Sequence, residues 1–157
     1  MSHLTRFSFG ATSAIITCLA LIIGLAKSPN PRFAIIGSLL VIAIADNISD
    51  SLGIHIYQES DLKKSEVVRT ATLFNFFTRF GVILVFILLV LLLPLLYASI
   101  LSIIWGMSLL ILLTYYIARE QNTNPYKAII GHVAIAVVVI IISNYVSEWI
   151  LQVFSTL

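Results

Sequence analysis

Two aspartates stand close together inside a strongly apolar stretch of the chain. Asp46 and Asp50 are four residues apart, and on a helix this spacing puts both side chains on one face, about one turn or ~6 Å apart. A charged aspartate deep in a lipid bilayer costs ~2.5–3.5 kcal/mol on insertion scales, and two on one face cost more because like charges repel. A bound cation, a proton, an arginine partner or water must therefore offset their charge.

The side chains near these aspartates favour a cation site. Carboxylates and neutral oxygens suit magnesium, calcium, manganese and ferrous iron, and an added imidazole favours iron, manganese or zinc. We therefore predict Asp46 and Asp50 to be metal ligands. In the alternative interpretation Asp46 pairs with Arg79 as its counter-ion, and Asp50 reaches interfacial water. On a helix Ser49, Gly53 and Tyr57 fall on or near the aspartate face, and Asn47, Ser51 and His55 form a second polar stripe roughly opposite.

Other polar residues are expected to line a path across the membrane. Ser13 carries a hydroxyl in the first apolar segment, although such hydroxyls more often bond back to their own helix. Glu59 belongs to an acidic group that could form a cytoplasmic mouth, but Lys63 and Lys64 interleave with this group, which favours a solvated linker. The residues predicted to line the path are Ser13, Asn47, Ser49 and Glu59.

Small residues recur every four positions beside the aspartates. Ala45, Ser49 and Gly53 follow this spacing, which permits close contact between membrane helices. If two copies of the chain meet there across a two-fold axis, four carboxylates come together, and such a cluster could hardly stay ionised without metal or protons. The pattern predicts a homodimer that exchanges a cation for protons.

The composition is that of a membrane protein. Of the 157 residues, 60% are hydrophobic and only 10% are charged, with a mean hydropathy of +1.07. A soluble domain carries roughly 25% charged residues, whereas in lipid the outward-facing side chains can be apolar. The net charge of +2 is too small to indicate nucleic-acid binding, and the one cysteine, Cys18, can form no intramolecular disulfide.

Polar stretches divide the chain into five apolar segments, each near the ~20 residues that a helix needs to cross the hydrocarbon core. No stretch between them is long enough to bury a core of its own, so we expect one all-α domain, a bundle of five transmembrane helices. The first segment is longer than a signal-peptide core, and we interpret it as a retained helix. The predicted spans are 7–26, 33–57, 72–93, 98–117 and 128–154.

The basic residues predict the orientation. Five spans put the termini on opposite sides of the membrane, and cytoplasmic loops carry an excess of lysine and arginine. We therefore expect the N-terminus inside and the C-terminus outside. The N-terminal side holds Arg6, Lys63, Lys64, Arg69, Arg119 and Lys127, and the other side holds Lys27 and Arg32.

Two segments carry a resemblance to a known family. Phe9-Gly-Ala-Thr-Ser-Ala-Ile-Ile-Thr-Cys-Leu-Ala-Leu-Ile-Ile-Gly24 resembles the first helix of the vacuolar iron transporter family, in which a Gly-Ala-(Asn/Ala)-Asp-Gly stretch opens an apolar run. Ile42-Ala-Ile-Ala-Asp-Asn-Ile-Ser49 resembles that family's second-helix Met-Ala-Ala-Gly-Glu-Tyr-(Leu/Val)-Ser. The five-span layout also fits, and the chain looks closest to short bacterial members with the pattern found here from Ala45 to His55.

The resemblance implies a dimer that exports ferrous iron or manganese from the cytosol in exchange for protons, with Asp46 at the family's second-helix acidic position. The implied location is the bacterial inner membrane, and no permanently bound cofactor is expected. This chain departs from the family pattern at three places. Ser13 stands where the family has an aspartate, Ile42 stands where it has a methionine, and the long glutamate-rich cytoplasmic helices are missing.

Two functions remain open from the sequence. The first is a proton-coupled divalent transition-metal transporter with Asp46 and Asp50 as ligands. The second is a non-transporting scaffold or accessory subunit in which these aspartates pair with Arg79. An enzyme is not expected, because lipid-headgroup transferases with paired aspartates need further aspartates that this segment lacks.

Overall fold

The computed structural model describes residues 3–60 and 65–154, with side chains from residue 10 onward, and every regular element in this part of the chain is helical. The second apolar segment forms one continuous helix made of three stretches, the middle of which is a π-helical turn, η1. The elements are α1 (His3–Leu25), α2 (Pro31–Val41), η1 (Ile42–Asp46), α3 (Asn47–Ser60), α4 (Ser65–Leu92), α5 (Leu95–Glu120) and α6 (Pro125–Phe154).

Prolines and asparagines set the helix boundaries. Pro31 and Pro125 are the first residues of α2 and α6, and Pro94 caps α5; proline suits these positions because it lacks the N–H that a first helical turn leaves unpaired. Asn122 has a φ of 53° in the turn after α5, a left-handed conformation that asparagine tolerates. The Oδ1 of Asn124 accepts the backbone N–H of Tyr126 at 3.0 Å and so caps α6.

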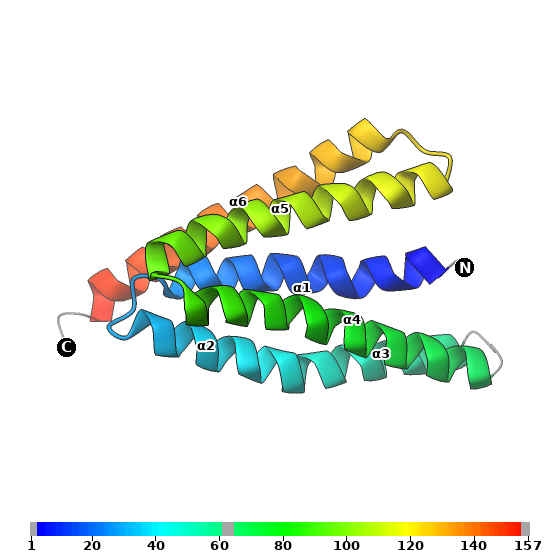
Figure 1. Ribbon diagram of the computed structural model, residues 1–157, viewed down its shortest axis with the longest axis horizontal. Helices are drawn as coiled ribbons and strands as arrows, with labels where there is room; N and C mark the ends of the chain where they lie inside the picture. Colours follow the sequence, from blue (N-terminus) through cyan, green and yellow to red (C-terminus); the bar gives the residue numbers. More distant parts are fainter. Residues whose placement is uncertain (1–2, 61–64, 155–157) are drawn as a thin grey trace.

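The five helical rods run antiparallel to their neighbours in sequence, with α1 at the centre of the bundle (Figure 1). The α2–α3 rod and α4 cover one side of α1, and α5 and α6 cover the other. The two termini lie at opposite ends. The N-terminal end of the bundle also holds the connections α3–α4 and α5–α6, and the C-terminal end holds α1–α2 and α4–α5.

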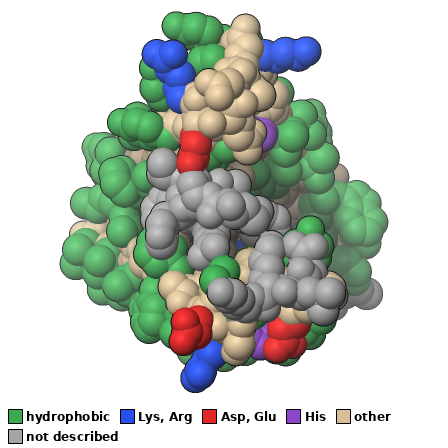
Figure 2. All heavy atoms as spheres, turned by 90° about the vertical axis from the view of Figure 1, so that its right-hand side faces the viewer, with side chains coloured by type: hydrophobic (Ala, Val, Ile, Leu, Met, Phe, Trp, Pro, Cys, Tyr) green, Lys and Arg blue, Asp and Glu red, His purple; other side chains and the backbone are tan. Residues whose placement is uncertain are grey.

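The surface is apolar where a soluble protein would be polar. Only Ala136 is buried along the 30 residues of α6, which exposes large side chains including Tyr145 and Trp149. By length and composition α4, α5, α6 and the α2–α3 rod could each cross a membrane, and α1 contributes the shorter apolar stretch Gly10–Leu25. Figure 2, which looks at the N-terminal end, shows hydrophobic side chains along its two sides and charged ones toward its top and bottom. The chain is built as an integral membrane protein.

The core lies where α1 meets its neighbours. Ile15, Leu19 and Ile22 are fully buried on α1. Gly106 lets α5 pack against them, because a Cβ at that position would lie 3.0 Å from Cδ1 of Leu19. The central place of α1 therefore depends on close backbone contact as well as on apolar burial.

The prediction of an all-α bundle of five helical segments is confirmed. The helices begin two to seven residues before the predicted spans, and their ends lie within three residues of the predicted ends. The π-helical turn was not predicted, since it leaves no mark in the hydropathy pattern. The linker after the second span stays helical to Ser60 and helical structure resumes at Ser65; Asp61, Lys63 and Lys64 lie outside the described residues. The direction of insertion into the membrane stays a prediction.

Candidate functional site

A buried arginine at the middle of α4 binds side chains from two neighbouring helical rods. Its Nη2 donates to Oδ2 of Asp46, and its Nη1 donates to Oδ2 of Asp50 at 2.7 Å and to Oγ of Ser13 at 3.0 Å. We call Ser13, Asp46, Asp50 and Arg79 the Arg79 cluster. Hydrogen bonds between charged partners are the strongest that side chains make, so the cluster ties α1 and the α2–α3 rod to α4.

The cluster lies midway between the two ends of the bundle. Asp46 is halfway along the 30-residue rod Pro31–Ser60, and Arg79 is halfway along the 28-residue α4. At 1.5 Å per residue each is about 20 Å from either end of its helix. If these helices cross a membrane with their midpoints at its centre, the bilayer penalises charges at this level most.

The charges of the Arg79 cluster do not balance. Two carboxylates face one guanidinium, which leaves a formal charge of −1. The side chain of Arg79 is 1% exposed, whereas those of Asp46 and Asp50 are 52% and 27% exposed. The surplus negative charge thus lies toward the outer surface of α3, and in a bilayer it calls for a proton or a further positive charge.

The π-helical turn ends at Asp46 and adjoins a second contact with α4. The Nδ2 of Asn47 donates to the carbonyl oxygens of Ala43, at 3.4 Å, and of Phe76, at 3.0 Å. Asn47 is fully buried and fixes the rod against α4 directly beside the aspartates. Turns of this kind are found frequently at functional sites in proteins.

The absence of a side chain at Gly10 is what brings α1 to the cluster. A Cβ at Gly10 would lie 2.2 Å from Oδ1 of Asn75 and 3.0 Å from Cγ of Arg79. No side chain fits in that space, so α1 and α4 can approach closely enough for Ser13 to reach Arg79. Asn75 in turn donates its Nδ2 to Oγ of Ser51 at 3.3 Å.

A second polar group lies nearer the N-terminal end, on α3 and α4. The Nδ1 of His55 is 3.2 Å from Oγ1 of Thr72, and its Nε2 is 3.3 Å from Oε1 of Glu59. The hydroxyl of Thr72 also donates to the carbonyl of Val68 at 2.9 Å. Since a carboxylate only accepts, Nε2 of His55 is the donor toward Glu59.

The predicted site residues fall into three groups. Asp46, Asp50 and Ser13 meet on Arg79, and Asn47 is buried beside them. Glu59 contacts His55, and Ser49 lies exposed on the outer face of α3. The hydroxyl of Thr17 bonds back to the carbonyl of Ser13 at 2.9 Å, as hydroxyls in helices often do.

Two residues of α4 belong to the site and were missed. Thr72 and Asn75 precede Arg79 by seven and four positions, which puts all three on one helical face. This spacing was visible in the sequence. It was overlooked because the polar content of α4 is sparse, whereas that of the aspartate-bearing segment is dense.

The arrangement in one chain gives the aspartates an arginine partner. Across the described residues, no group of three or more His, Cys, Asp or Glu side chains is placed to hold a metal ion. Asp46 contacts Arg79, as the alternative interpretation requires, and Asp50 does so too rather than reaching only interfacial water. Whether the pair also holds a cation depends on what neutralises the surplus carboxylate.

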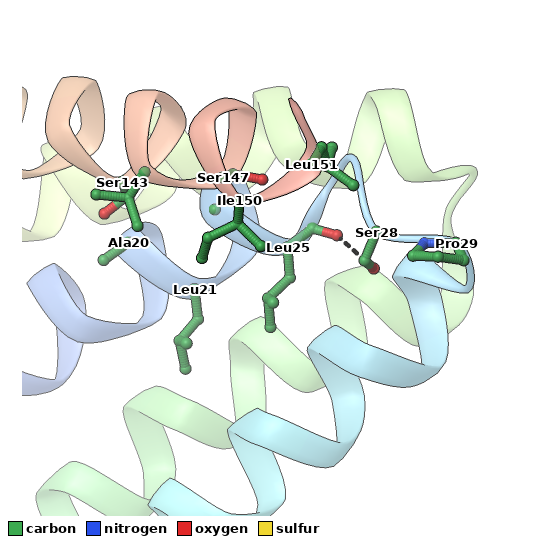
Figure 3. Close-up of a pocket in the computed structure, with 11 residues that line it drawn as sticks. Ala20, Leu21, Leu25, Ser28, Pro29, Ser143, Ser147, Ile150 and Leu151 are labelled. Atoms are coloured by element: carbon green, nitrogen blue, oxygen red, sulfur yellow. Dashed lines mark hydrogen bonds between the residues drawn. The ribbon is translucent and has the colours of Figure 1, made fainter. Parts of the chain in front are cut away.

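One described pocket lies away from the cluster, toward the C-terminal end (Figure 3). It has a volume of ≈ 370 Å³ between α1, the α1–α2 turn and α6. Its polar contacts are local, since the Oγ of Ser28 donates to the carbonyl of Leu25 at 2.9 Å. Leu21, Ile150 and Leu151 help to line it, so it is an apolar groove and no part of the charged site.

Comparison with models of protein families, with curated proteins and with solved structures finds no match to this chain. The resemblance to the vacuolar iron transporter family stays a prediction that rests on the residues quoted for it.

Proposed function

We propose that this protein is a membrane carrier that exchanges a divalent cation for protons at Asp46 and Asp50. The observation that carries the proposal is the surplus carboxylate of the Arg79 cluster. One aspartate would suffice to neutralise Arg79, and a second at this depth is costly unless it serves a purpose. Ionisable residues inside membrane helices commonly mark ion pathways and proton relays for this reason.

Arg79 has a defined part in this proposal. Its two Nη atoms engage the Oδ2 atoms of both aspartates, so it competes with any cation that approaches the pair. A proton on one carboxylate leaves the cluster neutral, and a divalent cation can displace that proton. Return of the proton then favours release of the cation, which couples the two flows.

The chemistry of the ligands defines the cargo class. Carboxylate oxygens with nearby amide and hydroxyl oxygens suit hard or intermediate divalent ions such as manganese and ferrous iron. The family resemblance favours the same two ions and export from the cytosol. We propose iron or manganese as the cargo on these combined grounds.

Pairing of two copies would complete the ligand set. Ala45, Ser49 and Gly53 are exposed on the outer face of the α2–α3 rod, and Gly53 has no neighbouring atom within 4 Å of where a Cβ would lie. This face adjoins the half-exposed Asp46, so contact there would bring two aspartate pairs together. We propose a homodimer with this face at its centre.

The second candidate is a scaffold or accessory subunit that transports nothing. The observation in its favour is that Arg79 binds both aspartates and Ser13 within one chain. In this account the cluster only locks three helical rods together. Its substitution would change stability and leave ion handling untouched.

Proton release on metal binding separates the two candidates. The purified protein is titrated with Mn²⁺ in weakly buffered detergent solution while the pH is recorded. The carrier proposal expects release of protons by the wild type and none by the Asp46→Asn/Asp50→Asn double variant, with Glu148→Gln, another carboxylate on a membrane helix, behaving as wild type. A wild type that binds no Mn²⁺ and releases no protons would support the scaffold instead.

A further inference from the structure

The buried face of the α2–α3 rod changes character at Asp46. Toward the C-terminal end its buried residues are Ile35, Leu39 and Ala43, all apolar. Toward the N-terminal end its buried residues are Asn47, Ser51 and Gln58, all polar. Over the same stretch α3 exposes apolar side chains such as Leu52 and Ile56, so it hides polar groups and presents apolar ones to lipid.

The facing helix α4 changes at the same level. Its buried residues beyond Arg79 are Ile83, Phe86, Ile87 and Val90. Before Arg79 the buried residues are Val68, Ala71 and Asn75, and Thr72 is half-buried against α3. The interface of α4 with the α2–α3 rod therefore carries its buried polar side chains on one side of the Arg79 cluster, which we call its polar half, and only apolar ones on the other side.

Three side-chain contacts occur in the polar half. Asn75 donates to Ser51 at 3.3 Å, His55 contacts Thr72 at 3.2 Å, and Glu59 lies 3.3 Å from His55 at the end. We call this set the α3–α4 polar seam: Asn47, Ser51, His55, Gln58, Thr72 and Asn75. It spans the 13 residues between Asp46 and Glu59, or about 20 Å of helix.

Three side chains of the seam also carry unused acceptors. Oδ1 of Asn47, Oδ1 of Asn75 and Oε1 of Gln58 are buried and have no hydrogen-bond partner among the described residues. The amide nitrogens of Asn47 and Asn75 are engaged as donors. Since Oδ1 of Asn75 packs against Gly10 of α1, Oδ1 of Asn47 and Oε1 of Gln58 are the acceptors that a ligand can reach along the seam. Buried polar atoms in proteins nearly always have partners, and amide oxygens accept from water or bind cations.

From this arrangement we propose that the α3–α4 polar seam is a hydrated access route by which small cations reach the Arg79 cluster from the N-terminal end of the bundle. His55 and Glu59 form its mouth, and the apolar half of the same interface closes the cluster toward the C-terminal end. The charged α4 residues near the mouth, Glu66 and Arg69, are exposed.

The inference rests on the proposed function only for the identity of the cargo. The route itself is a property of the bundle and can be tested without transport. Ser51 and Leu39 offer a matched pair, since they lie on the buried face of the same rod on opposite sides of Asp46 and are 4% and 0% exposed.

The test is the rate of thiol labelling in reconstituted vesicles. Ser51→Cys and Leu39→Cys are made separately in a Cys18→Ala background and treated with aminoethyl methanethiosulfonate, a small cationic reagent. We expect the Ser51→Cys variant to be labelled at least about tenfold faster than the Leu39→Cys variant. Adding His55→Phe should remove most of this advantage, because a phenyl ring has no nitrogen to hydrogen-bond water or the neighbouring Thr72 and Glu59 at the mouth.

Equal labelling rates at 51 and 39, with both variants folded by circular dichroism, would overturn the route. Thr72→Cys and Ile83→Cys provide a second pair on α4 if either first variant fails to fold. A fast reaction at 51 in a protein that moves no cation would leave the route standing and reject the carrier. Cation flux through a protein whose Ser51→Cys variant is labelled no faster than Leu39→Cys would reject the route and leave the carrier standing.

Discussion

Arg79 and Asp46 meet halfway along their helices, with the guanidinium buried and the carboxylate half exposed. Each side of this contact has a different environment. The guanidinium of Arg79 is enclosed by α1, the α2–α3 rod and α4. The carboxylate of Asp46 lies on the outer face of the α2–α3 rod, beside small residues. A structural ion pair needs only one carboxylate, so the second aspartate on the same arginine is the feature that a function must explain.

Removing the arginine should destabilise the bundle. Arg79→Met leaves two carboxylates without a counter-charge, and breaking a buried ion pair costs about 3–5 kcal/mol; we expect the lower end, because the aspartates are partly exposed. Thermal unfolding in detergent measures the loss. Adding Asp46→Asn and Asp50→Asn should restore most of it, and an Arg79→Met variant as stable as the wild type would contradict the arrangement.

Removing one aspartate should have a different effect. Asp46→Asn leaves one carboxylate against one guanidinium, so the surplus charge in the membrane disappears and the thermal midpoint should stay the same or rise. Cation binding should nevertheless be lost. A variant that melts as early as Arg79→Met would show that the second carboxylate is needed for structure.

Because α1 and α4 are in close contact at Gly10, added side-chain volume at that position should lower the stability of the bundle. Gly10→Ala puts a methyl group where Oδ1 of Asn75 lies, and overpacking of this kind costs about 1–3 kcal/mol. Gly81→Ala is the control, because nothing lies within 4 Å of that position. Thermal unfolding should show a loss only at Gly10, which Asn75→Ala should partly rescue.

The exposed small-residue face predicts the dimer contact. Gly53→Leu should lower the dimeric fraction counted by single-molecule photobleaching in liposomes, because leucine prevents close approach of two rods. Gly131→Leu on α6 is the matched control, since that glycine also has open space around it. Equal dimer fractions for both variants would place the contact elsewhere.

The sequence predicts the helices well and the site in part. Five apolar runs separated by prolines and charged turns leave little choice of architecture, because lipid demands helices that satisfy their own backbone. The spacing of Asp46 and Asp50 puts both on one helical face, and both contact Arg79, which was named as a possible counter-ion. These are properties of single helices.

What the sequence could not give is which helix covers which face. The stripe of Asn47, Ser51 and His55 was recognised, but its burial against Thr72 and Asn75 depends on how α3 packs on α4. The reach of Ser13 to Arg79 likewise depends on the backbone contact at Gly10. Such contacts arise from tertiary packing, which a helical projection does not contain.

Cation flux into proteoliposomes tests the central claim most directly. Wild type and Asp46→Asn/Asp50→Asn are compared for manganese, ferrous iron, zinc and calcium, with internal pH recorded and Ser102→Ala as a control for a buried polar group on α5, away from the rod that carries the aspartates. The account predicts that the wild type and the control move manganese or iron against counter-flowing protons and that the double variant does not. If the folded wild type moves none of the four ions under any pH gradient, the carrier proposal is contradicted. The Arg79 cluster would then serve only to hold the helices together.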